Sequence, residues 1–383
     1  MTSRRGVLKL IGGGVVLAAV GAGAFAALNQ PSRAAREAWR EAGSPAEYRR
    51  RFLSYALLAP NPHNMQPWLA RLDGENGLTL YCDLERRLPE TDPFDRQILI
   101  GHGCFLELLA LAAAEEGYAA EIEAFPDGAP EMTARLDGRP VARVIFRPGG
   151  VTPDPLFAHA LTRRTNRNAY EAREVDAAAL SALAAAGAAY GMTPGAIGEG
   201  DLAAALRDLT WRAHEVEVRT PATWKESLDV MRIGAAEVAR HRDGLSMEGP
   251  MLSALNMAGI LTRETLADPN SQAFQQGLDM YRPLAASARA FAWIANDGES
   301  REGEIAAGRA YMRLALQAEA LGLAIHPWSQ ALQEYPEMAE LFDEVHGLIG
   351  GGQRLQMLVR AGYAGQVVAA PRRGLAAHLM TET

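Results

Sequence analysis

The sequence predicts an α+β fold built from two related α-β-α units, with a helical insertion in the second unit. Three observations lead to this prediction. Segment 103–117 matches segment 308–322 at an offset of 205 residues. Each segment is followed by a β-rich stretch, at 141–147 in the first half and at 355–360 in the second. Residues 202–290 have no counterpart in the first half, so we interpret them as an inserted lid.

Both matching segments are predicted to be mostly buried helices that end at a glycine. The identities in the self-match are Gly103/Gly308, Leu109/Leu314, Ala110/Ala315, Leu111/Leu316, Ala113/Ala318 and Gly117/Gly322, with Arg96/Arg301 just upstream. Two alanine-rich helices can match by chance. Chance is disfavoured here because residues 144–149 and 357–362 also match, at an offset of 213 that needs only a short insertion in a loop. We therefore expect a duplicated unit.

Local patterns predict the remaining elements of the two halves. Residues 33–58 are predicted to be helical, while Leu78–Asp83 and Phe291–Ala295 are predicted strands. Residues 154–164 and 176–187 are predicted helices on either side of a polar turn.

The insertion is predicted to be largely helical. Its expected helix breaks are at Pro221, Gly244, Gly249, Pro250 and Pro269. It contains five methionines, which are typical of an adaptable core or of a substrate pocket: Met231, Met247, Met251, Met257 and Met280. The expected organisation is an N-terminal segment 1–28, a first half 33–150 and a second half 151–375 that carries the insertion.

Composition narrows the function classes. The chain has 383 residues, a net charge of −8 and no long basic run, so nucleic acid is not an expected partner. The only cysteines are Cys82 and Cys104; we favour two buried thiols over a bridge between them. The sequence contains no CxxC, HExxH or GxxxxGK[ST] motif, which argues against metal and nucleoside-triphosphate chemistry.

The N-terminus has the pattern of an export signal. Arg4 and Arg5 precede an apolar, glycine-rich stretch from Leu10 to Leu28, which contains the cleavage-site pattern Ala24-Phe25-Ala26. The arginine pair resembles a twin-arginine signal, whose export machinery carries folded proteins. We expect an exported protein, periplasmic or in the cell envelope. The stretch is also just long enough to remain as a membrane anchor.

A proline-rich turn is the first candidate for a binding site. The run from Ala59 to Trp68 fixes the backbone at three prolines and exposes amide side chains. Amide donors and acceptors at fixed positions suit the edge of a planar heteroaromatic ring. The candidate residues are Pro60, Asn61, Pro62, Asn64 and Gln66. A capped turn between a helix and a strand would explain the prolines alone.

Three further segments add candidates. Arg163, Arg164, Thr165 and Arg167 place three guanidinium groups and a hydroxyl within five residues, a combination that can bind phosphate, although arginine clusters are often only a solvated surface. Residues Pro327, Trp328 and Ser329 follow the second repeated helix. The pair Arg372 and Arg373 near the C-terminus, taken alone, is typical of a solvated tail.

Together these four segments resemble the nitroreductase family of FMN-dependent oxidoreductases, over nearly all of residues 45–375. Ala59 to Trp68 looks like the family's P-S-x-x-N-x-Q-P-W turn, with Asn61 and Pro62 where small hydroxyl residues usually stand. Residues 163–167 look like its R-R-S-x-R clamp, and residues 308–329 like the helix and loop that pack along the flavin. Arg372 or Arg373 resembles the C-terminal phosphate ligand.

The order of the motifs resembles the fused, Acg-like branch of this family, in which one chain replaces a homodimer. The first half keeps the turn and the second half keeps the clamp, so the resemblance implies one composite FMN site in a monomeric pseudo-dimer. The complementary site is expected to be inactive, since the sequence shows no second N-x-Q-P-W and no second R-R-x-x-R.

The resemblance implies how the candidates bind FMN. Arg163, Arg167 and Arg372 or Arg373 would hold the phosphate, with Arg164 and Thr165 on the phosphate or ribityl chain. Asn64 and Gln66 would bond the ribityl chain or ring edge, with residues 327–329 near the reactive face.

The expected activity is reduction of a small acceptor, a nitro compound or a quinone, through bound FMN. The electron donor is NAD(P)H or another redox carrier. Two alternatives remain open: a protein that sequesters FMN under its lid with little turnover, and an exported binding protein without flavin.

Overall fold

Two four-stranded antiparallel sheets organise the chain, whose computed structural model describes residues 25–380. The first sheet has the order β1-β2-β4-β3 and the second β5-β8-β10-β9. The first-half strands are β1 (Trp68–Asp73), β2 (Gly77–Cys82), β3 (Tyr118–Ala124) and β4 (Pro140–Pro148). The second-half strands are β5 (Thr193–Ile197), β8 (Ala290–Asn296), β9 (Ala324–Pro327) and β10 (Arg354–Gly362). The second order repeats the first, strand for strand along the chain.

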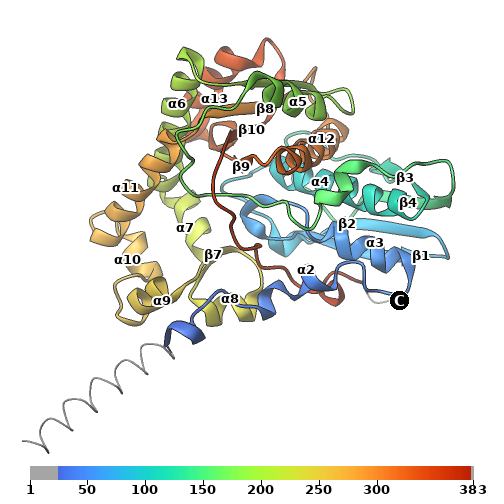
Figure 1. Cartoon of the computed structure of the whole chain (residues 1–383), viewed down its shortest axis with the longest axis horizontal. Helices are drawn as coiled ribbons and strands as arrows, with labels where there is room; N and C mark the ends of the chain where they lie inside the picture. The colour runs from blue at the N-terminus through green and yellow to red at the C-terminus, as the bar shows by residue number, and fades with distance from the viewer. Residues whose placement is uncertain (1–24, 381–383) are drawn as a thin grey trace, which may run out of the picture.

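Each sheet carries one long helix between its second and third strands in sequence. These helices, α4 (Arg96–Glu115) and α12 (Arg301–Ala320), pack against each other in the middle of the molecule, with one sheet on either side (Figure 1). Helix α4 is long and apolar enough to cross a membrane, but 89% of its apolar window is buried inside the protein. Its composition is therefore explained by the core that it forms with α12.

The two helices touch at a pair of glycines, Gly103 on α4 and Gly308 on α12, whose Cα atoms face each other. A Cβ added to Gly308 would lie 2.0 Å from the carbonyl oxygen of Ile100, and one added to Gly103 would lie 2.1 Å from that of Ile305. Only glycine permits this backbone contact. The glycine pair that anchors the sequence self-match is therefore the point of closest approach between the halves.

A second matched pair, Arg96 and Arg301, joins the halves reciprocally. Arg96 at the start of α4 donates to the carbonyl oxygens of Leu332 (2.7 Å) and Gln356 (2.9 Å) in the second half. Arg301 at the start of α12 donates to first-half carbonyls, including that of Phe94 at 2.8 Å. Each half thus supplies a buried guanidinium that satisfies backbone acceptors of the other.

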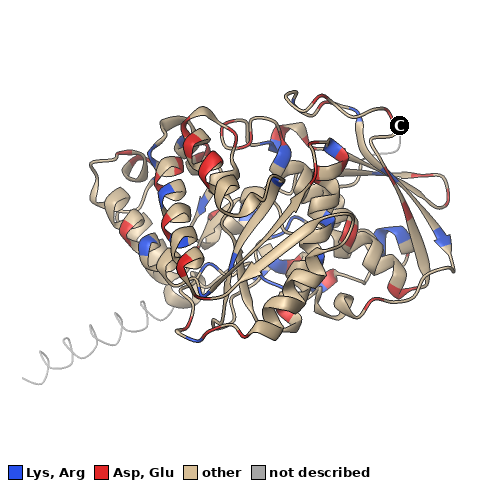
Figure 2. Cartoon of the chain, turned by 90° about the horizontal axis from the view of Figure 1, so that it is seen from above, with Lys and Arg blue, Asp and Glu red and all other residues tan. Residues whose placement is uncertain are grey.

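The large insertion lies between β5 and β8, where the first half has only the tight turn between β1 and β2. It contains α6 (Asp201–Arg219), α7 (Pro221–Asp229), β6 (Met231–Ile233), α8 (Ala235–His241), β7 (Leu245–Met247), α9 (Pro250–Met257), α10 (Arg263–Ala267) and α11 (Gln272–Ala286). These elements form a wall along one side of both halves (Figure 1). Along the elements visible in Figure 2, basic and acidic residues are interspersed.

Other predicted elements agree in part. The predicted strands at 78–83, 141–147, 291–295 and 355–360 are present, as is a helix at 177–187, α5. The predicted helical segment 33–58 is mostly helical but interrupted: α2 (Glu37–Glu41) and α3 (Tyr48–Ala56) are separated at Gly43, whose φ is +84°. The predicted helix at 154–164 is only a 3-10 turn, Pro155–His159. The parallel pair β6–β7 was not predicted. A short helix, α13 (Ala339–Val345), follows β9.

Both cysteines are free and buried, as favoured from the sequence. The predicted export signal lies almost entirely outside the described residues, so it stays a prediction.

Candidate functional site

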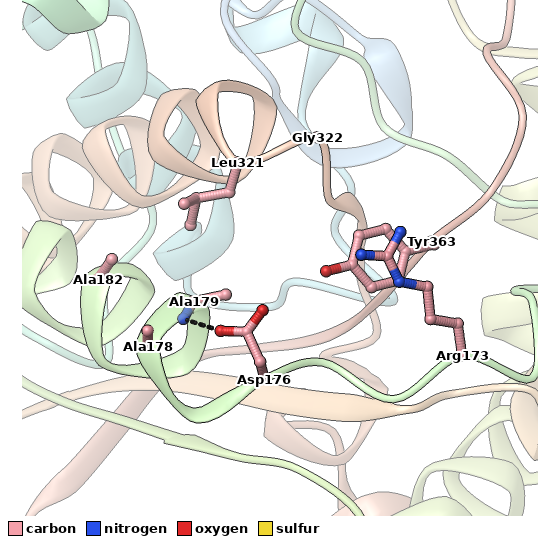
Figure 3. Close-up of a pocket in the computed structure, with 8 residues that line it drawn as sticks. All are labelled: Arg173, Asp176, Ala178, Ala179, Ala182, Leu321, Gly322 and Tyr363. Atoms are coloured by element: carbon pink, nitrogen blue, oxygen red, sulfur yellow. Dashed lines mark hydrogen bonds between the residues drawn. The ribbon is translucent and has the colours of Figure 1, made fainter.

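An open surface pocket of about 650 Å³ lies at the C-terminal end of α12 (Figure 3). Its wall includes Asp176, which caps α5 by accepting from the amide of Ala179, and Arg173, whose guanidinium lies 3.8 Å from the ring centre of Tyr363. None of the residues predicted to form the site lines this pocket. The predicted residues instead meet deeper, between the two halves and beneath the insertion.

The proline-rich turn between α3 and β1 is strained. His63, Asn64 and Gln66 have φ angles of +44°, +56° and +55°, a conformation that L-residues rarely adopt. Each such residue costs about 1–3 kcal/mol and persists only where its surroundings hold it. The turn lies against α4, where a Cβ on Gly101 would come within 3.3 Å of Asn61 and Pro62. Concentrated strain of this kind is typical of a functional site.

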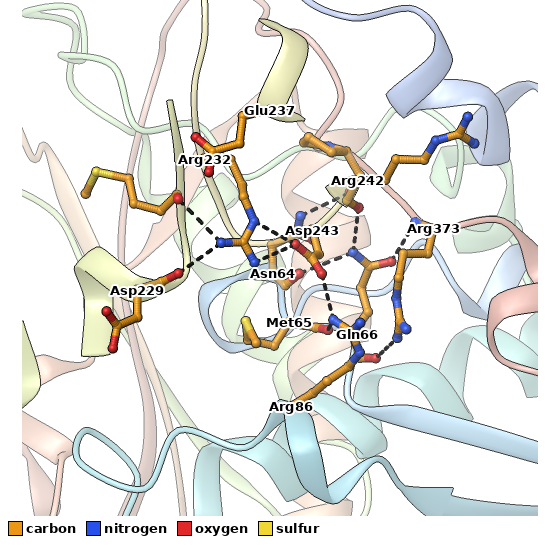
Figure 4. Close-up of polar contacts among 12 residues, drawn as sticks. Asn64, Met65, Gln66, Arg86, Asp229, Arg232, Glu237, Arg242, Asp243 and Arg373 are labelled. Carbon is orange, nitrogen blue, oxygen red and sulfur yellow. Dashed lines mark hydrogen bonds and ion pairs between the residues drawn. The ribbon is translucent and has the colours of Figure 1, made fainter. Parts of the chain in front are cut away.

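Gln66 holds the turn in this shape. Its side chain is fully buried; Nε2 donates to the carbonyl of Arg242 at 3.0 Å and Oε1 accepts from the amide of Arg373 at 2.9 Å (Figure 4). Its own amide donates to Asn61 Oδ1 at 2.7 Å. Both polar atoms of the Gln66 side chain therefore have partners within the protein. Its position in the structure is that of a structural residue of the turn.

Arg372 and Arg373 diverge into different surroundings. Arg372 is buried and donates to the carbonyls of Leu57 (2.9 Å) and Ala59 (2.9 Å) at the end of α3, and to Asn64 Oδ1. Arg373 turns away, donating to the carbonyl of Gln66 at 2.7 Å. Arg372 is thus the member of the pair that faces the predicted site.

Arg372 joins Arg163, Arg164 and Arg167 in a cluster of positive charge. Burial and the charges of Arg163, Arg164 and Arg167 lower the pKa of Arg372 to about 9. Arg163 is 3% exposed and its Nη1 has no hydrogen-bond partner among the described residues. Arg164 lies 4.3 Å from the ring centre of Trp39.

No described carboxylate forms an ion pair with any of the four arginines, of which Arg163 and Arg372 are buried, Arg164 is half-buried and Arg167 is exposed. Of the other buried arginines among the described residues, Arg96 and Arg301 each pair with a glutamate, and Arg360 has no carboxylate partner. Buried charge without a counter-charge is unfavourable. The cluster therefore has the electrostatic character of an anion site, most simply a phosphate site.

The loop that carries three of these arginines is fixed to the second sheet. Asn166 donates its amide to the carbonyl of Ile325 on β9 at 2.9 Å and its side-chain nitrogen to the carbonyl of Gly365 at 2.9 Å. Thr165 and Arg167 flank this anchor. The clamp residues are thus presented from the second half, opposite the turn of the first half.

The segment after β9 has mixed roles. Ser329 Oγ donates to the carbonyl of Leu358 at 2.8 Å and accepts from its amide at 3.1 Å, so this hydroxyl is engaged with β10. Trp328 is 2% exposed and its Nε1 has no partner among the described residues. Pro327 pairs with Val359 at the end of β9. Of these three residues, Trp328 has a side-chain nitrogen without a hydrogen-bond partner among the described residues.

Sequence patterns did not identify three further residues near the site, Arg360, Glu217 and His214. Arg360 on β10 is fully buried, donates to His326 Nδ1 at 3.3 Å and lies 4.8 Å from the ring centre of Trp328. Glu217 and His214 extend from α6 of the insertion. Glu217 Oε1 lies 3.9 Å from His63 Nε2, and His214 contacts the ring of Trp328. Nothing in the local sequence around Glu217 distinguishes it from the other charges of an amphipathic helix.

The insertion is fastened over the turn by buried polar contacts. Asp243 accepts from Arg86 Nη1 at 2.6 Å and from Arg232 Nε at 3.0 Å (Figure 4). The amide of Gly244 donates to the carbonyl of Asn64 at 3.2 Å. Further along the first half, Glu226 accepts from the Thr91 hydroxyl at 2.6 Å. These contacts hold the insertion against the strained turn.

Comparison with known proteins finds similarity to the same family that the motifs resemble. A Mycobacterium tuberculosis (strain H37Rv) protein provisionally named NAD(P)H nitroreductase is 27% identical over 327 residues, 83% of this chain and 86% of that protein. A second protein of that organism, provisionally named NAD(P)H nitroreductase acg, is 36% identical over 72 residues, 19% of this chain and 22% of that protein.

The chain is similar to nitroreductases. No protein-family model matches it.

Solved structures give a weaker likeness. The FMN-dependent nitroreductase NfnB from Mycobacterium smegmatis in complex with NADPH has 19% identity and a TM-score of 0.36, covering 60% of this chain and 98% of NfnB. A nitroreductase with bound FMN from Bacteroides fragilis has 15% identity and a TM-score of 0.32, covering 55% and 89%. TM-scores this low do not establish a shared fold over the whole chain.

The second half differs from the first where the proline-rich turn would recur. Between α5 and β5 stands Tyr190, whose hydroxyl donates to Glu107 Oε2 at 2.6 Å. Glu107 also accepts from Arg309 (3.0 Å) and Arg313 (2.9 Å). The arginines at this position have a carboxylate partner, in contrast to the cluster around Arg372. Within residues 25–380, no group of three or more His, Cys, Asp or Glu side chains could hold a metal ion.

Proposed function

We propose that this chain is an FMN-dependent oxidoreductase of nitroreductase type, with one FMN between its two halves. The observation that carries the proposal is the cluster of Arg163, Arg164, Arg167 and Arg372, four arginines without a carboxylate partner among the described residues, beside the strained turn. A phosphate supplies the missing negative charge. The similarity to proteins named as NAD(P)H nitroreductases supports the flavin assignment and favours NAD(P)H as electron donor.

Buried polar atoms without partners fit the group. Among the described residues these include Arg163 Nη1, Tyr311 OH, His63 Nδ1 and Trp328 Nε1. Tyr311 and Arg163 are near enough to affect each other's pKa, which places a donor pair at the phosphate end. Trp328 contacts His214 of α6, and His63 lies 3.9 Å from Glu217 of the same helix.

The residues then have separate tasks. Arg163 and Arg167 hold the phosphate by hydrogen bonds, with Arg164 and Thr165 beside it. Arg372 contributes positive charge there, because its guanidinium already donates to the carbonyls of residues 57–59 and 371 and to Asn64 Oδ1. Pro60, Asn61, Pro62 and Asn64 form the wall that positions the ring, and Gln66 keeps that wall in shape. Bound FMN supplies hydride or electron transfer to a small acceptor of the nitro or quinone class. Pro327, Trp328 and the insertion exclude water from the ring.

The repeated strand order, the facing Gly103 and Gly308, and the reciprocal Arg96 and Arg301 support an origin by duplication, with the insertion as lid. The Glu107 network at Tyr190 supports a single active site per chain. Export through the twin-arginine route is part of the proposal and is supported by the sequence of residues 4–28 alone.

The first experiment is the visible spectrum of purified protein, with identification of any flavin released by heat. Near-stoichiometric FMN is expected. Arg163→Ala removes charge-assisted hydrogen bonds worth about 1.5–3 kcal/mol, so the FMN Kd should rise roughly 10- to 100-fold. Arg147→Ala is the matched control, because Arg147 is exposed and pairs with Glu121 on the far strands. A colourless protein that does not take up added FMN would refute the proposal.

A further inference from the structure

Glu217 is the buried carboxyl of this chain with the weakest set of partners near the site. The other buried carboxyls among the described residues have shorter hydrogen bonds. Asp92 accepts from the amides of Gln97 and Ile98, Asp95 Oδ2 from the amide of Leu136, Glu107 from Arg309 and Arg313, Asp243 from Arg86 and Arg232, and Glu304 from Arg301. Glu217 is 6% exposed and its one recorded hydrogen bond, from Gln333 Nε2, is 3.5 Å long. No described arginine, lysine or backbone amide bonds to it.

Polar atoms without partners surround this carboxyl. The side chains of Ser227, Gln330 and Gln333 lie beside Glu217, and Tyr335 is close enough for Glu217 to raise the pKa of its hydroxyl. Among the described residues, Gln330 Oε1, Gln333 Oε1 and His63 Nδ1 have no hydrogen-bond partner. The hydroxyls of Ser227 and Tyr335 lie near Glu217 and Thr223, respectively, but make no hydrogen bond of normal geometry with them. A packed core avoids such groups. Together they form a buried polar cluster, the Glu217 cluster, beside His63 of the proline-rich turn.

The charged and titratable groups facing Glu217 come from four elements. His63 is on the turn, His214 on α6 itself, Glu226 on α7, and Tyr335 lies before α13. Burial raises the pKa of Glu217 to about 7, and Glu226 adds to this rise. Burial lowers the pKa of His63 and of His214 to about 4, with Arg167 adding to the effect at His63. Glu226 is held by Thr91 and two backbone amides. Near neutral pH, Glu217 is therefore the group in this set that gains or loses a proton.

We propose that Glu217 donates the proton that a quinone-class acceptor needs when it is reduced at this site, an inference that rests on the proposed function. The acceptor takes up one hydride equivalent from the reduced flavin and one proton from Glu217. The Glu217 O–H bond breaks, an O–H bond forms on the acceptor oxygen, and a carboxylate remains. Its proton returns from solvent by way of His63, whose Nε2 lies 3.9 Å from Glu217 Oε1. The insertion thus contributes a reacting group as well as a cover.

The test compares wild type with Glu217→Gln, which keeps the shape of the side chain but does not titrate. Glu215→Gln is the matched control on α6, because Glu215 is on the outer side near Arg219 and Arg282. The first readout is infrared absorption of the flavin-free proteins between about pH 5.5 and about pH 8.5, a range that spans the shifted value. Asp92 and Glu304, whose pKa burial also raises to about 7, contribute protonated-carboxyl absorption in every variant. We therefore expect the wild-type minus Glu217→Gln difference spectrum to show one protonated-carboxyl band that disappears with rising pH, and the wild-type minus control difference to show none.

The second readout is the rate at which excess p-benzoquinone reoxidises the dithionite-reduced, flavin-loaded protein in stopped flow. Above pH 7 the wild-type rate should fall about tenfold per pH unit, whereas Glu217→Gln should be flat with pH and roughly 100-fold slower at low pH. Wild-type kinetics that do not vary with pH, or an unchanged profile in Glu217→Gln, would overturn the inference even with FMN fully bound. Failure of both proteins to bind FMN would instead refute the proposed function, and the two failures are therefore distinguishable.

Discussion

Substituting Gly308 by alanine tests whether the helix contact at the centre of the molecule is as close as its geometry indicates. The added Cβ would lie 2.0 Å from Ile100 O and 2.8 Å from the Cα of Gly103. The first distance is roughly 1.4 Å shorter than ordinary van der Waals contact. Both obstructing atoms belong to backbone, so no side chain can rotate away. The helices α4 and α12 must therefore move apart, which disturbs the core of both halves.

Overpacking of this kind costs about 1–3 kcal/mol, and a backbone obstruction places Gly308→Ala at about 3 kcal/mol or more. At roughly 1.2 °C per kcal/mol for a chain of 383 residues, Tm should fall by about 4 °C or more. Gly277→Ala on α11 is the control: nothing lies within 4 Å of its added Cβ, so stability should rise by about 0.5–1 kcal/mol. Differential scanning calorimetry and urea unfolding measure both. A Gly308→Ala protein as stable as wild type would refute the close contact.

Two further predictions concern pH and the insertion. Because the pKa of Glu217 is raised from 4.5 to about 7 in the folded protein, the folded state binds this proton more tightly, and stability falls as pH rises between those values. Wild type should lose up to about 3 kcal/mol of unfolding free energy between about pH 5 and about pH 8 that Glu217→Gln does not lose. Urea unfolding of both proteins at the two pH values measures this difference. An equal pH dependence in the two proteins would contradict the prediction. Asp243→Asn should loosen the insertion, because it weakens the contacts that Arg86 and Arg232 make there. In the Asp243→Asn protein, limited proteolysis within residues 231–249 should be at least about tenfold faster than in wild type. The control Asp208→Asn, on the exposed face of α6, should be cleaved at the wild-type rate.

The sequence carried enough information for the framework. Periodicity and the self-match predicted the two long helices and the strands on either side of them, because buried apolar runs and glycine stops are local signals. The break within residues 33–58 was not predicted, since it depends on one positive φ at Gly43 and on Ser54, which accepts from the Gly43 amide. Motifs likewise indicated which segments would form the site.

The roles within the site were beyond local patterns. The Gln66 side chain donates to the carbonyl of Arg242, which is 176 positions away in the sequence. Of Arg372 and Arg373, only Arg372 bonds the carbonyls at the end of α3, and no local pattern distinguishes the two. Glu217 gains its significance only from the residues packed around it. Partners that distant are fixed by tertiary structure, so their contribution appears only in three dimensions.

The short connection from β4 to the second half, residues 149–154, changes how the composite site assembles. In a homodimer, two subunits must meet by diffusion, so the fraction of complete sites falls on dilution. Here the turn and the arginine cluster belong to one covalent chain, so their encounter is intramolecular, with an effective concentration set by a linker of a few residues. The fraction of molecules with a complete site should therefore be independent of protein concentration. Each half can also vary independently, because a substitution in one half of a single chain is not copied into the other. The Glu107 network and the arginine cluster already give the two halves different polar surroundings.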